Sequence, residues 1–561
     1  MREDDDIQRA LPGFEPPPPP APRPPPPIIE APTPEQRAII EYVRSGDRHV
    51  IVEALAGAGK TSTILQSLVT STAARVLLTS FGNAIVATLE ERLPKAPPGR
   101  TWQAKTLHRA GLGVLRSYGW EPDPDDDLHG IHSDASEKLV NDMATSIEEI
   151  VTEENNNSLP LWFDLPFVLA EKVTRAVISD DIRRAASELL KHWKLTCLPH
   201  SDVSSVQEED SVDALDNIKE EEEPLARTIA HFAYVMGARL DRTKIDFEDM
   251  IWLPLVLDLM PKWPYDLIFV DEAQDLNRPQ FALTLRLMKP DARLIVVGDL
   301  YQSMYGWRGA VGDEVWKTLR AMGARTMPLT VSFRCPRVVV EMANQLVPDL
   351  RARDGAPLGK IHACSFTKMI DGLPNTTIQS FVLSRNNAVL FETAIQLWRR
   401  GALFNFSKGE ELAKGLHALV DHLMPKGAPQ DLNSFLVSLD TWHEQAVEKA
   451  KEKKALSKID RLDQKRLTLL ALLKCTEPRG LHALLRRLTS SRDAVVKLAT
   501  VHGTKGLEAD RVYLLRQTFA RYSDRSPDQD AIPQEELNIE YVAITRSKSE
   551  LVWVDLPKEE A

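Results

Sequence analysis

Short apolar runs alternate with amphipathic stretches along most of the chain. A first set of runs is HVIVEAL (49–55), RVLLTSF (75–81), YDLIFVD (265–271) and ARLIVVGD (292–299), and a second is SFVLSRN (380–386), VVKLATVHG (495–503), RVYLL (511–515) and ELVWVDL (550–556). Continuous apolar runs of this length predict strands buried on both faces of a parallel sheet. Helical spacing in PEQRAIIEYVRSG (34–46) and KTSTILQSLVTS (60–71) predicts helices on the faces of the first sheet. The pattern therefore predicts an α/β fold with two parallel-sheet lobes.

Each lobe is interrupted by a stretch without strand signals. The segments SEKLVNDMATSIEEIV (136–151) and DIRRAASELLKHW (181–193) have helical spacing. Residues 12–34 hold 13 of the 38 prolines and predict a polyproline-II tail. We therefore divide the chain into a Pro-rich tail (1–32), a first lobe (33–110 and 236–330) with a helical insertion (111–235), and a second lobe (331–404 and 491–561) with a helical, basic insertion (405–490).

Charge is distributed unevenly. The formal net charge is −12, and residues 208–223 alone contribute −8 through nine acids and one lysine. Residues 449–466 carry eight bases and three acids, a local +5, which is either a solvated helix face or a binding patch.

No apolar run is long enough to span a membrane, and the acidic N-terminus predicts no signal peptide. We expect an intracellular protein of the cytoplasm or nucleoid, of the nucleus in a eukaryote, or of the host cell if the source is viral. The four cysteines are scattered without CxxC spacing, so neither a zinc site nor a disulfide framework is expected.

The stretch ALAGAGKTST (54–63) lies between a predicted strand and a predicted helix, as a phosphate-binding loop requires. The loop residues Gly57, Ala58 and Gly59 would direct backbone N–H groups at phosphate oxygens, with Lys60 reaching the β- and γ-phosphates. Thr61 would offer its hydroxyl to Mg²⁺, and Ser62 completes the loop.

A carboxylate pair follows the strand LIFV (267–270). Ligands of parallel α/β sheets bind at the carboxyl ends of the strands. We expect Asp271 to hold the metal together with Thr61, and Glu272 to take a proton from the attacking water. Phosphoryl transfer also needs positive charge at the γ-phosphate, for which Arg334 and Arg546 are candidates.

Nine motifs occur in a specific order: EALAGAGKTST, LLTSFGNA, AKTLHRAG, DEAQD, VVGDLYQSMYGWRGA, VSFRCP, VLSRNNA, ATVHGTKGLEADRVYLL and EELNIEYVAITRSK. Together they resemble the UvrD/Rep type of superfamily 1 DNA helicases, and the wording of GTKGLE and YVAITRSK is similar to the F-box-helicase-like branch. The resemblance covers residues 33–561. It implies two RecA-like lobes that clasp ATP.

The resemblance also assigns roles at the nucleotide. Gln36 would read the adenine, Phe333 would stack on it, and Glu508 would contact the ribose region. Arg334 and Arg546 would be the arginine fingers of the second lobe. Gln302 would couple the γ-phosphate to the DNA site.

The residues matching the DNA contacts of the family are Phe81, Asn83, Thr106, His108, Tyr305, Trp307, Arg385, Asn387, Thr500 and His502. Aromatic side chains such as Tyr305 and Trp307 grip a single strand without reading its sequence, because every base has a π-face. Individually, Phe81 could equally be a core residue, and His108 and His502 buried histidines.

We expect an ATP-dependent helicase that uses ATP and Mg²⁺, moves 3′ to 5′ on single-stranded DNA and unwinds duplex at single–double-strand junctions, in repair, recombination or replication. The polarity rests on the QSxYxWRGA and ITRSK wording, because the 5′ to 3′ branch ends in an SR-type motif. We expect a monomer, with no nuclease domain after Arg546 and with a tail that is either solvated or bound by a partner protein. Three alternatives stay open: a translocase that strips proteins from single strands, a catalytically quiet DNA-binding scaffold, and an RNA track.

Overall fold

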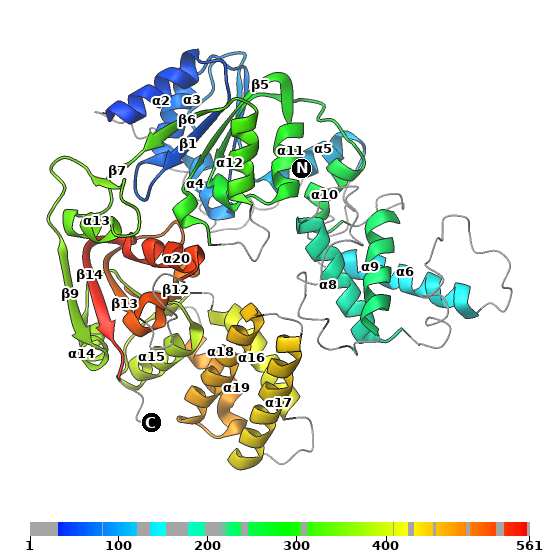
Figure 1. Cartoon of the computed structure of the whole chain (residues 1–561), viewed down its shortest axis with the longest axis vertical. Helices are drawn as coiled ribbons and strands as arrows, with labels where there is room; N and C mark the ends of the chain where they lie inside the picture. The colour runs from blue at the N-terminus through cyan, green and yellow to red at the C-terminus, as the bar shows by residue number, and fades with distance from the viewer. Residues whose placement is uncertain are drawn as a thin grey trace, which may run out of the picture.

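The computed structural model describes residues 32–80, 82–120, 135–152, 178–196, 215, 218, 222–236, 245–304, 311–407, 409–424, 431–452, 456–489, 494–522 and 532–557. Two sheet-containing lobes stack on one another, and a group of helices extends from each (Figure 1). Residues 1–31 of the Pro-rich tail and most of the acidic run 208–223 lie outside the described residues.

The first lobe is built on a six-stranded parallel sheet with the order β3-β2-β4-β5-β1-β6. Its strands are β1 (Val50–Ala54), β2 (Arg75–Ser80), β3 (Thr101–Ala104), β4 (Tyr265–Asp271), β5 (Met288–Gly298) and β6 (Arg325–Leu329). The central strands are buried on both faces, because helices cover the sheet on both sides. All carboxyl ends consequently lie along one edge, which is where the phosphate-binding loop emerges from β1.

The helices of this lobe are α2 (Pro34–Ser45), α3 (Lys60–Thr70), α4 (Asn83–Arg92), α5 (Leu107–Ser117), α10 (Asp249–Val256), α11 (Arg278–Arg286) and α12 (Gly312–Ala321), with short 3₁₀ turns η4 (Ala273–Asp275) and η5 (Leu300–Gln302). Helix α2 begins at Thr33, whose side chain and that of Gln36 form a reciprocal capping box. This cap holds α2 against α3 and directs Gln36 toward the phosphate-binding loop.

The second lobe repeats the design, with the parallel order β11-β12-β10-β13-β14-β9. Its strands are β9 (Lys360–Ser365), β10 (Ser380–Ser384), β11 (Asn405–Phe406), β12 (Val496–Thr500), β13 (Ala509–Leu515) and β14 (Ser547–Asp555). Its helices are α13 (Arg337–Ala343), α14 (Phe366–Gly372), α15 (Asn387–Arg399) and α20 (Gln534–Ile544), with short turns η7 (Leu373–Asn375), η9 (Val501–Thr504), η10 (Arg516–Thr518) and η11 (Ala520–Tyr522). A small pair, β7 (Val331–Ser332) and β8 (Arg351–Ala352), lies at the entry to this lobe.

The first insertion contains α6 (Ala135–Thr152), α8 (Asp180–Thr196) and α9 (Glu223–Met236). These helices share a core with the ends of α5 and α10, so the insertion is anchored on the first lobe. At the centre of this core, the Lys194 ammonium, which is fully buried, contacts Asp249 at 2.7 Å and Asp246 at 3.2 Å.

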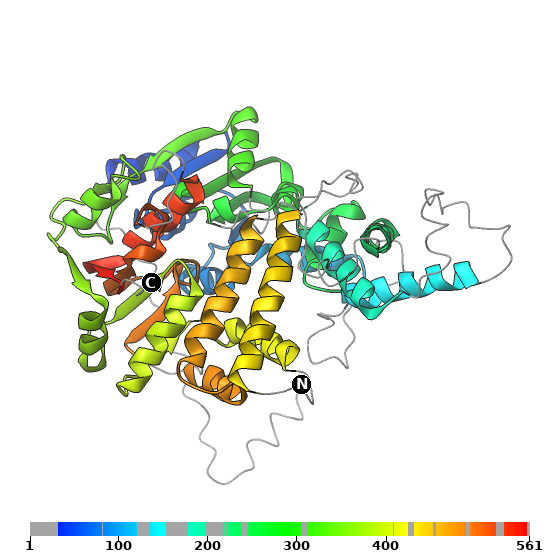
Figure 2. The same ribbon diagram turned by 60° about the horizontal axis from the view of Figure 1, so that its bottom comes forward.

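The second insertion contains α16 (Gly409–Leu423), α17 (Leu432–Glu452), α18 (Leu456–Leu473), η8 (Pro478–Gly480) and α19 (Leu481–Thr489). The turned view of Figure 2 brings these yellow and orange helices forward as a bundle beside the second lobe. Helix α18 packs along α15 of the lobe. Residues 405–406, at the start of the stretch expected to be helical, instead form the edge strand β11.

The prediction of an α/β fold with two parallel, RecA-like sheets is confirmed. The short strands β3, β6, β9 and β11, which lie at the edges of the sheets, were not among the predicted strands. Edge strands such as β9, in which no residue is fully buried, have no continuous apolar run to reveal them. Among the described residues, no helix has the length and apolar character needed to cross a membrane.

Candidate nucleotide and nucleic-acid site

The phosphate-binding loop adopts a conformation that depends on its glycines. Gly57 and Gly59 have φ values of 72° and 79°, in the left-handed region where side chains are strained. A Cβ on Gly57 would lie 2.6 Å from the Ser332 hydroxyl and 2.8 Å from Arg334 Cβ. Ala58 of the loop is buried, and Lys60, Thr61 and Ser62 form the first turn of α3. The backbone amides at this helix start therefore face the site where an anion is favoured.

Lys60 and the carboxylate pair meet in front of this loop. The Lys60 ammonium lies 2.8 Å from Glu272 Oε1, and the Thr61 hydroxyl donates to Asp271 Oδ2 at 3.4 Å. Glu272 has a φ of 54°, a strained value that turns its side chain back from β4 toward Lys60. The threonine hydroxyl and the Asp271 carboxylate are hard oxygen donors, which is the set that Mg²⁺ prefers, so these residues fit the metal expected from the sequence.

Burial and the ion pair with Lys60 give the two carboxyl groups different pKa values. Burial alone would raise the pKa of Glu272, but the cations of Lys60 and Lys505 lower that pKa to about 2. Burial and the neighbouring Glu272 charge raise the pKa of Asp271 to about 6. Burial would lower the pKa of Lys60, yet the surrounding carboxylates, led by Glu272, raise it. Glu272 is therefore ionised at neutral pH, the state that a general base requires.

Gln36 and Phe333 flank the loop on its other side. The buried Gln36 amide donates to the Thr63 hydroxyl at 3.3 Å, and the Phe333 ring remains 42% exposed. A Cβ on Gly59 would lie 3.0 Å from Gln36 Nε2 and 3.8 Å from Phe333 Cδ2. The polar amide and the exposed ring thus lie next to the same glycine, an arrangement that suits a planar base beside bound phosphates.

The two candidate arginine fingers both come from the second lobe. Arg334 pairs with Glu508 at 2.6 Å, which brings together two residues assigned separately by resemblance. Arg546 is buried and donates to the carbonyls of Val542 and Leu507 and, at 3.3 Å, to Gln302 Oε1. Burial and the nearby Arg334 charge lower the pKa of Arg546 to about 9. Both guanidinium groups lie close enough to influence one another at the nucleotide site.

A set of residues that the sequence did not reveal joins the lobes. The Tyr541 hydroxyl accepts a hydrogen bond from the Ala56 amide of the phosphate-binding loop at 3.0 Å and lies 3.4 Å from Asp299 Oδ2. The same Asp299 carboxylate accepts from Gln302 Nε2 at 2.7 Å. Both residues stand inside quoted motifs, but only the packed structure reveals that they touch.

Lys505 forms a second unpredicted connection. Its ammonium, from the second lobe, lies 2.7 Å from Asp275 and donates to the Gln302 carbonyl at 2.9 Å. Burial raises the pKa of Asp275 to about 6, although Lys505 acts in the opposite direction. Gln302 is therefore held by Arg546, Lys505 and Asp299 together.

The DNA-contact candidates of the first lobe follow neighbouring strands. Asn83 is exposed at the start of α4, after β2, whereas Thr106 and His108 follow β3. Thr106 caps α5 through its hydroxyl, and the buried His108 ring stacks on Phe247 at 3.8 Å. Burial lowers the pKa of His108 to about 4. Phe81, Tyr305 and Trp307 lie outside the described residues.

The corresponding candidates of the second lobe meet at paired strand ends. Ser384 of β10 is the register partner of Thr500 of β12, so Arg385 and Asn387 emerge beside Thr500 and His502. Arg385 forms an ion pair with Glu536, and Asn387 begins α15. Burial and the Arg385 charge lower the pKa of His502 to about 4. These four candidates therefore lie together.

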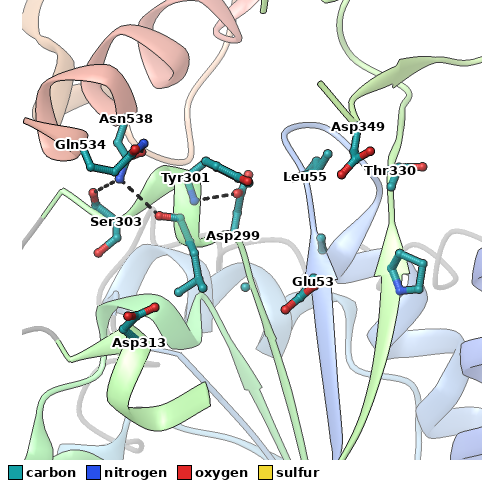
Figure 3. Close-up of a pocket in the computed structure, with 14 residues that line it drawn as sticks. Glu53, Leu55, Asp299, Tyr301, Ser303, Asp313, Thr330, Asp349, Gln534 and Asn538 are labelled. Atoms are coloured by element: carbon teal, nitrogen blue, oxygen red, sulfur yellow. Dashed lines mark hydrogen bonds between the residues drawn. The ribbon is translucent and has the colours of Figure 1, made fainter. Parts of the chain in front are cut away.

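A cavity of about 500 Å³ lies between the two lobes, beside the end of β1 (Figure 3). The first lobe lines it with Glu53, Leu55 and Tyr301, among others, and the second lobe with residues that include Gln534 and Asn538. Asn538 reaches across to donate to the carbonyls of Leu300 and Ser303, at 3.3 Å and 3.0 Å. Because both lobes line the cavity, a change in the angle between them must change its volume.

Two protein-family models match the chain. The family model described as the UvrD/REP helicase N-terminal domain matches residues 33–319, which is more than half of the chain, and the model of the UvrD-like helicase C-terminal domain matches residues 426–555. The matched ranges include the phosphate-binding loop, the carboxylate pair and Arg546.

Individual DNA helicases are also similar to the chain. F-box DNA helicase protein 1 of Schizosaccharomyces pombe is 24% identical over 93% of this chain and 57% of its own length. The ATP-dependent DNA helicase Rep of Escherichia coli is 27% identical over 32% of this chain and 26% of its own length. The ATP-dependent DNA helicase PcrA of Leuconostoc citreum is 30% identical over 25% of this chain and 19% of its own length. The chain thus spans less than two thirds of each of these relatives. Because the N-terminal family model matches more than half of the chain, the chain belongs to the UvrD/REP family of ATP-dependent DNA helicases.

Proposed function

We propose that this protein is an ATP-driven motor that moves 3′ to 5′ along single-stranded DNA and unwinds duplex DNA at junctions. The observation that carries the proposal is the convergence of Arg334, Lys505 and Arg546, all from the second lobe, on the nucleotide site of the first. A site completed by two lobes can couple the state of its nucleotide to the angle between them.

Each side chain has a task in this reaction. Lys60 exchanges its carboxylate partner for phosphate oxygens, and Glu272 accepts a proton from the attacking water. Arg334 and Arg546 stabilise the charge that develops on the transferred phosphoryl group. Thr61 and Asp271 would hold Mg²⁺, which neutralises phosphate charge when bound.

The path for DNA follows the strand ends of both lobes. Thr106 and His108 stand after β3 in the first lobe, and Arg385 and His502 stand after β10 and β12 in the second. The His502 imidazole is hydrogen-bonded to the backbone of Met304, just after Gln302. This contact supports a connection between the nucleotide site and the strand. The 3′ to 5′ direction rests on the family resemblance of the motifs, and repair, recombination or replication is the setting proposed on the same ground.

The first test is steady-state ATP hydrolysis with and without single-stranded DNA. We expect strong stimulation by the strand in the intact chain, and Lys60→Ala should lower turnover by at least about 10³-fold, because the cation on the transferred phosphoryl group is lost. Lys317→Ala is the control, since this lysine is exposed on α12 of the same lobe. Unchanged turnover in Lys60→Ala would refute the nucleotide site, and turnover without any stimulation would favour an RNA track, which RNA added in the same assay reveals.

A second assay tests the direction of movement along the strand and whether the motor unwinds duplex DNA or displaces bound protein. Strand separation is measured on duplexes with a 3′ or a 5′ single-stranded tail, in parallel with displacement of a protein bound to a tail without a duplex. We expect unwinding of the 3′-tailed duplex alone. Displacement without unwinding would indicate the protein-stripping translocase, and DNA binding without hydrolysis would indicate a quiet scaffold.

A further inference from the structure

The chain passes from the first lobe to the second at Thr330. This residue lies between Leu329, the last residue of β6, and Val331, the first residue of β7. It also lines the cavity between the lobes, where Figure 3 labels it. From the second-lobe side, the Arg351 amide of β8 donates to the Thr330 carbonyl at 2.9 Å. The position of Thr330 in the first lobe therefore depends on what holds its other polar groups.

Glu35, in the first turn of α2, holds those groups. Its Oε2 accepts a hydrogen bond from the Thr330 amide at 2.8 Å, and its Oε1 accepts one from the Thr330 hydroxyl at 2.7 Å. Hydrogen bonds to an ionised acceptor are roughly twice as strong as those between neutral groups. Both side chains are half-buried, so water competes for these bonds only in part. One carboxylate thus fastens the crossover between the lobes to α2.

The two ends of this link carry the groups expected at the base of the nucleotide. Gln36 directly follows Glu35 on α2, and Phe333 follows Thr330 by three residues. The Phe333 amide donates to a carbonyl of the phosphate-binding loop at 2.9 Å. The Phe333 ring and the Gln36 amide both lie beside Gly59 of that loop. The bonds of Glu35 to Thr330 therefore connect the helix that carries the amide directly to the segment that carries the ring.

We propose that Glu35 is a positioning residue for base selection, which sets the spacing between Gln36 and Phe333. The inference rests on the proposed ATP-driven motor and concerns how that motor chooses its nucleotide. A hydrogen bond to the edge of the base has a narrow range of distances, so it is lost when the amide and the ring move apart. Phosphate contacts through Lys60 do not depend on this spacing. Loss of Glu35 should consequently weaken recognition of the base and leave the hydrolysis step in place.

The test is steady-state hydrolysis of ATP and of GTP by the full chain with saturating single-stranded DNA. GTP carries the same phosphates and a purine ring of similar area, but a different hydrogen-bonding edge. We expect Glu35→Ala to raise KM for ATP about tenfold with kcat within about twofold, because ground-state and transition-state binding weaken alike. KM for GTP should rise less, so the ratio of kcat/KM for ATP to that for GTP should fall by at least about threefold.

Two further variants separate the hydrogen bonds from the charge. Glu35→Gln can accept from the Thr330 amide and donate to the Thr330 hydroxyl, so KM and the preference for ATP should stay within about twofold of the intact chain. The double variant Glu35→Ala/Thr330→Val should have the same KM as Glu35→Ala, because the bond to the hydroxyl is already absent. Glu41→Ala is the matched control, since it removes an exposed carboxylate that pairs with Arg44 on the same helix.

The possible outcomes are distinct. The inference is overturned if Glu35→Ala has the KM and the ATP preference of Glu41→Ala. A fall in kcat that is equal for ATP and GTP, with the preference unchanged, also overturns it and indicates a purely structural role. Equal use of ATP and GTP by the intact chain would overturn it as well, because no base would then be selected. Absence of ATP hydrolysis by the intact chain would instead overturn the proposed function.

Discussion

Tyr541 illustrates at the residue scale how the two lobes meet. It is fully buried, and its hydroxyl satisfies the Ala56 amide of the phosphate-binding loop while lying near the Asp299 carboxylate. Burial and the Asp299 charge raise the pKa of Tyr541 well above its usual value, so the hydroxyl stays protonated and can donate. One side chain of the second lobe thus holds the base of the nucleotide site in the first.

We predict that Tyr541→Phe weakens the use of ATP without weakening DNA binding. The ring still fills its place, but the Ala56 amide loses its partner and the loop is less well held. We expect kcat/KM for ATP to fall about tenfold, equivalent to about 1.4 kcal/mol, chiefly through a higher KM. Steady-state kinetics with saturating DNA, and strand binding by anisotropy, measure the two effects.

The control for this change is Tyr522→Phe, which removes a hydroxyl that lies 3.5 Å from Glu540 on the same lobe. This variant should match the intact chain. Equal KM values for Tyr541→Phe and the intact chain would show that the hydroxyl does not position the loop.

At the scale of elements, the first insertion depends on a buried charge cluster in α8. Lys194 is enclosed by Asp246, Asp249, the Ser136 hydroxyl and the Trp252 ring. Burial alone would raise the pKa of Asp246, but Lys194 lowers it. The stabilisation is therefore present at neutral pH and is lost as the pH falls through that lowered pKa. The cluster links α6 and α8 to α10 and to Asp246 just before it.

We predict that Lys194→Met destabilises this insertion by about 3–5 kcal/mol, because two carboxylates are left buried without a cation. Hydrogen exchange of the α8 amides at neutral pH measures the local free energy of opening. Arg184→Met, which removes an exposed partner of Asp181 on the same helix, should change that free energy by less than about 0.5 kcal/mol. Equal protection in both variants would contradict a stabilising role for the cluster.

At the scale of the whole molecule, the lobes are joined around Gln302. Lys505 binds both Asp275 and the Gln302 carbonyl, and Arg546 binds the Gln302 side chain. Because Gln302 precedes the segment proposed to contact DNA, we infer that these bonds link the DNA strand, the nucleotide and the angle between the lobes.

We predict that Lys505→Ala uncouples ATP hydrolysis from DNA. Removal of the cation leaves Asp275 buried without its partner and frees Gln302 from the second lobe. The stimulation of hydrolysis by single-stranded DNA should fall about tenfold or more, while strand affinity changes by less than about twofold. Lys548→Ala, which removes a partly exposed partner of Asp510 on the same lobe, is the control. Full stimulation in Lys505→Ala would argue against this connection.

Local sequence was sufficient to predict the strands and the loop that form the proposed nucleotide site. The apolar runs of β1, β4, β5 and β10 predicted buried parallel strands, and the glycines and Lys60 between β1 and α3 predicted a phosphate-binding loop. These signals lie within a few residues of one another, so spacing along the chain is enough to reveal them.

Contacts between distant segments were decided only by the tertiary structure. The pairing of Ala56 with Tyr541 joins residues 485 positions apart, and the packing of α18 on α15 joins two helices of separate parts of the chain. Short edge strands such as β11 likewise depend on a neighbouring strand for their hydrogen bonds. The sequence by itself determined the fold class, the family and the nucleotide-binding motifs, because these follow from local periodicity and residue order. The contacts between the lobes and the packing of α18 on α15 depend on which surfaces meet, and only the tertiary structure decides which surfaces meet.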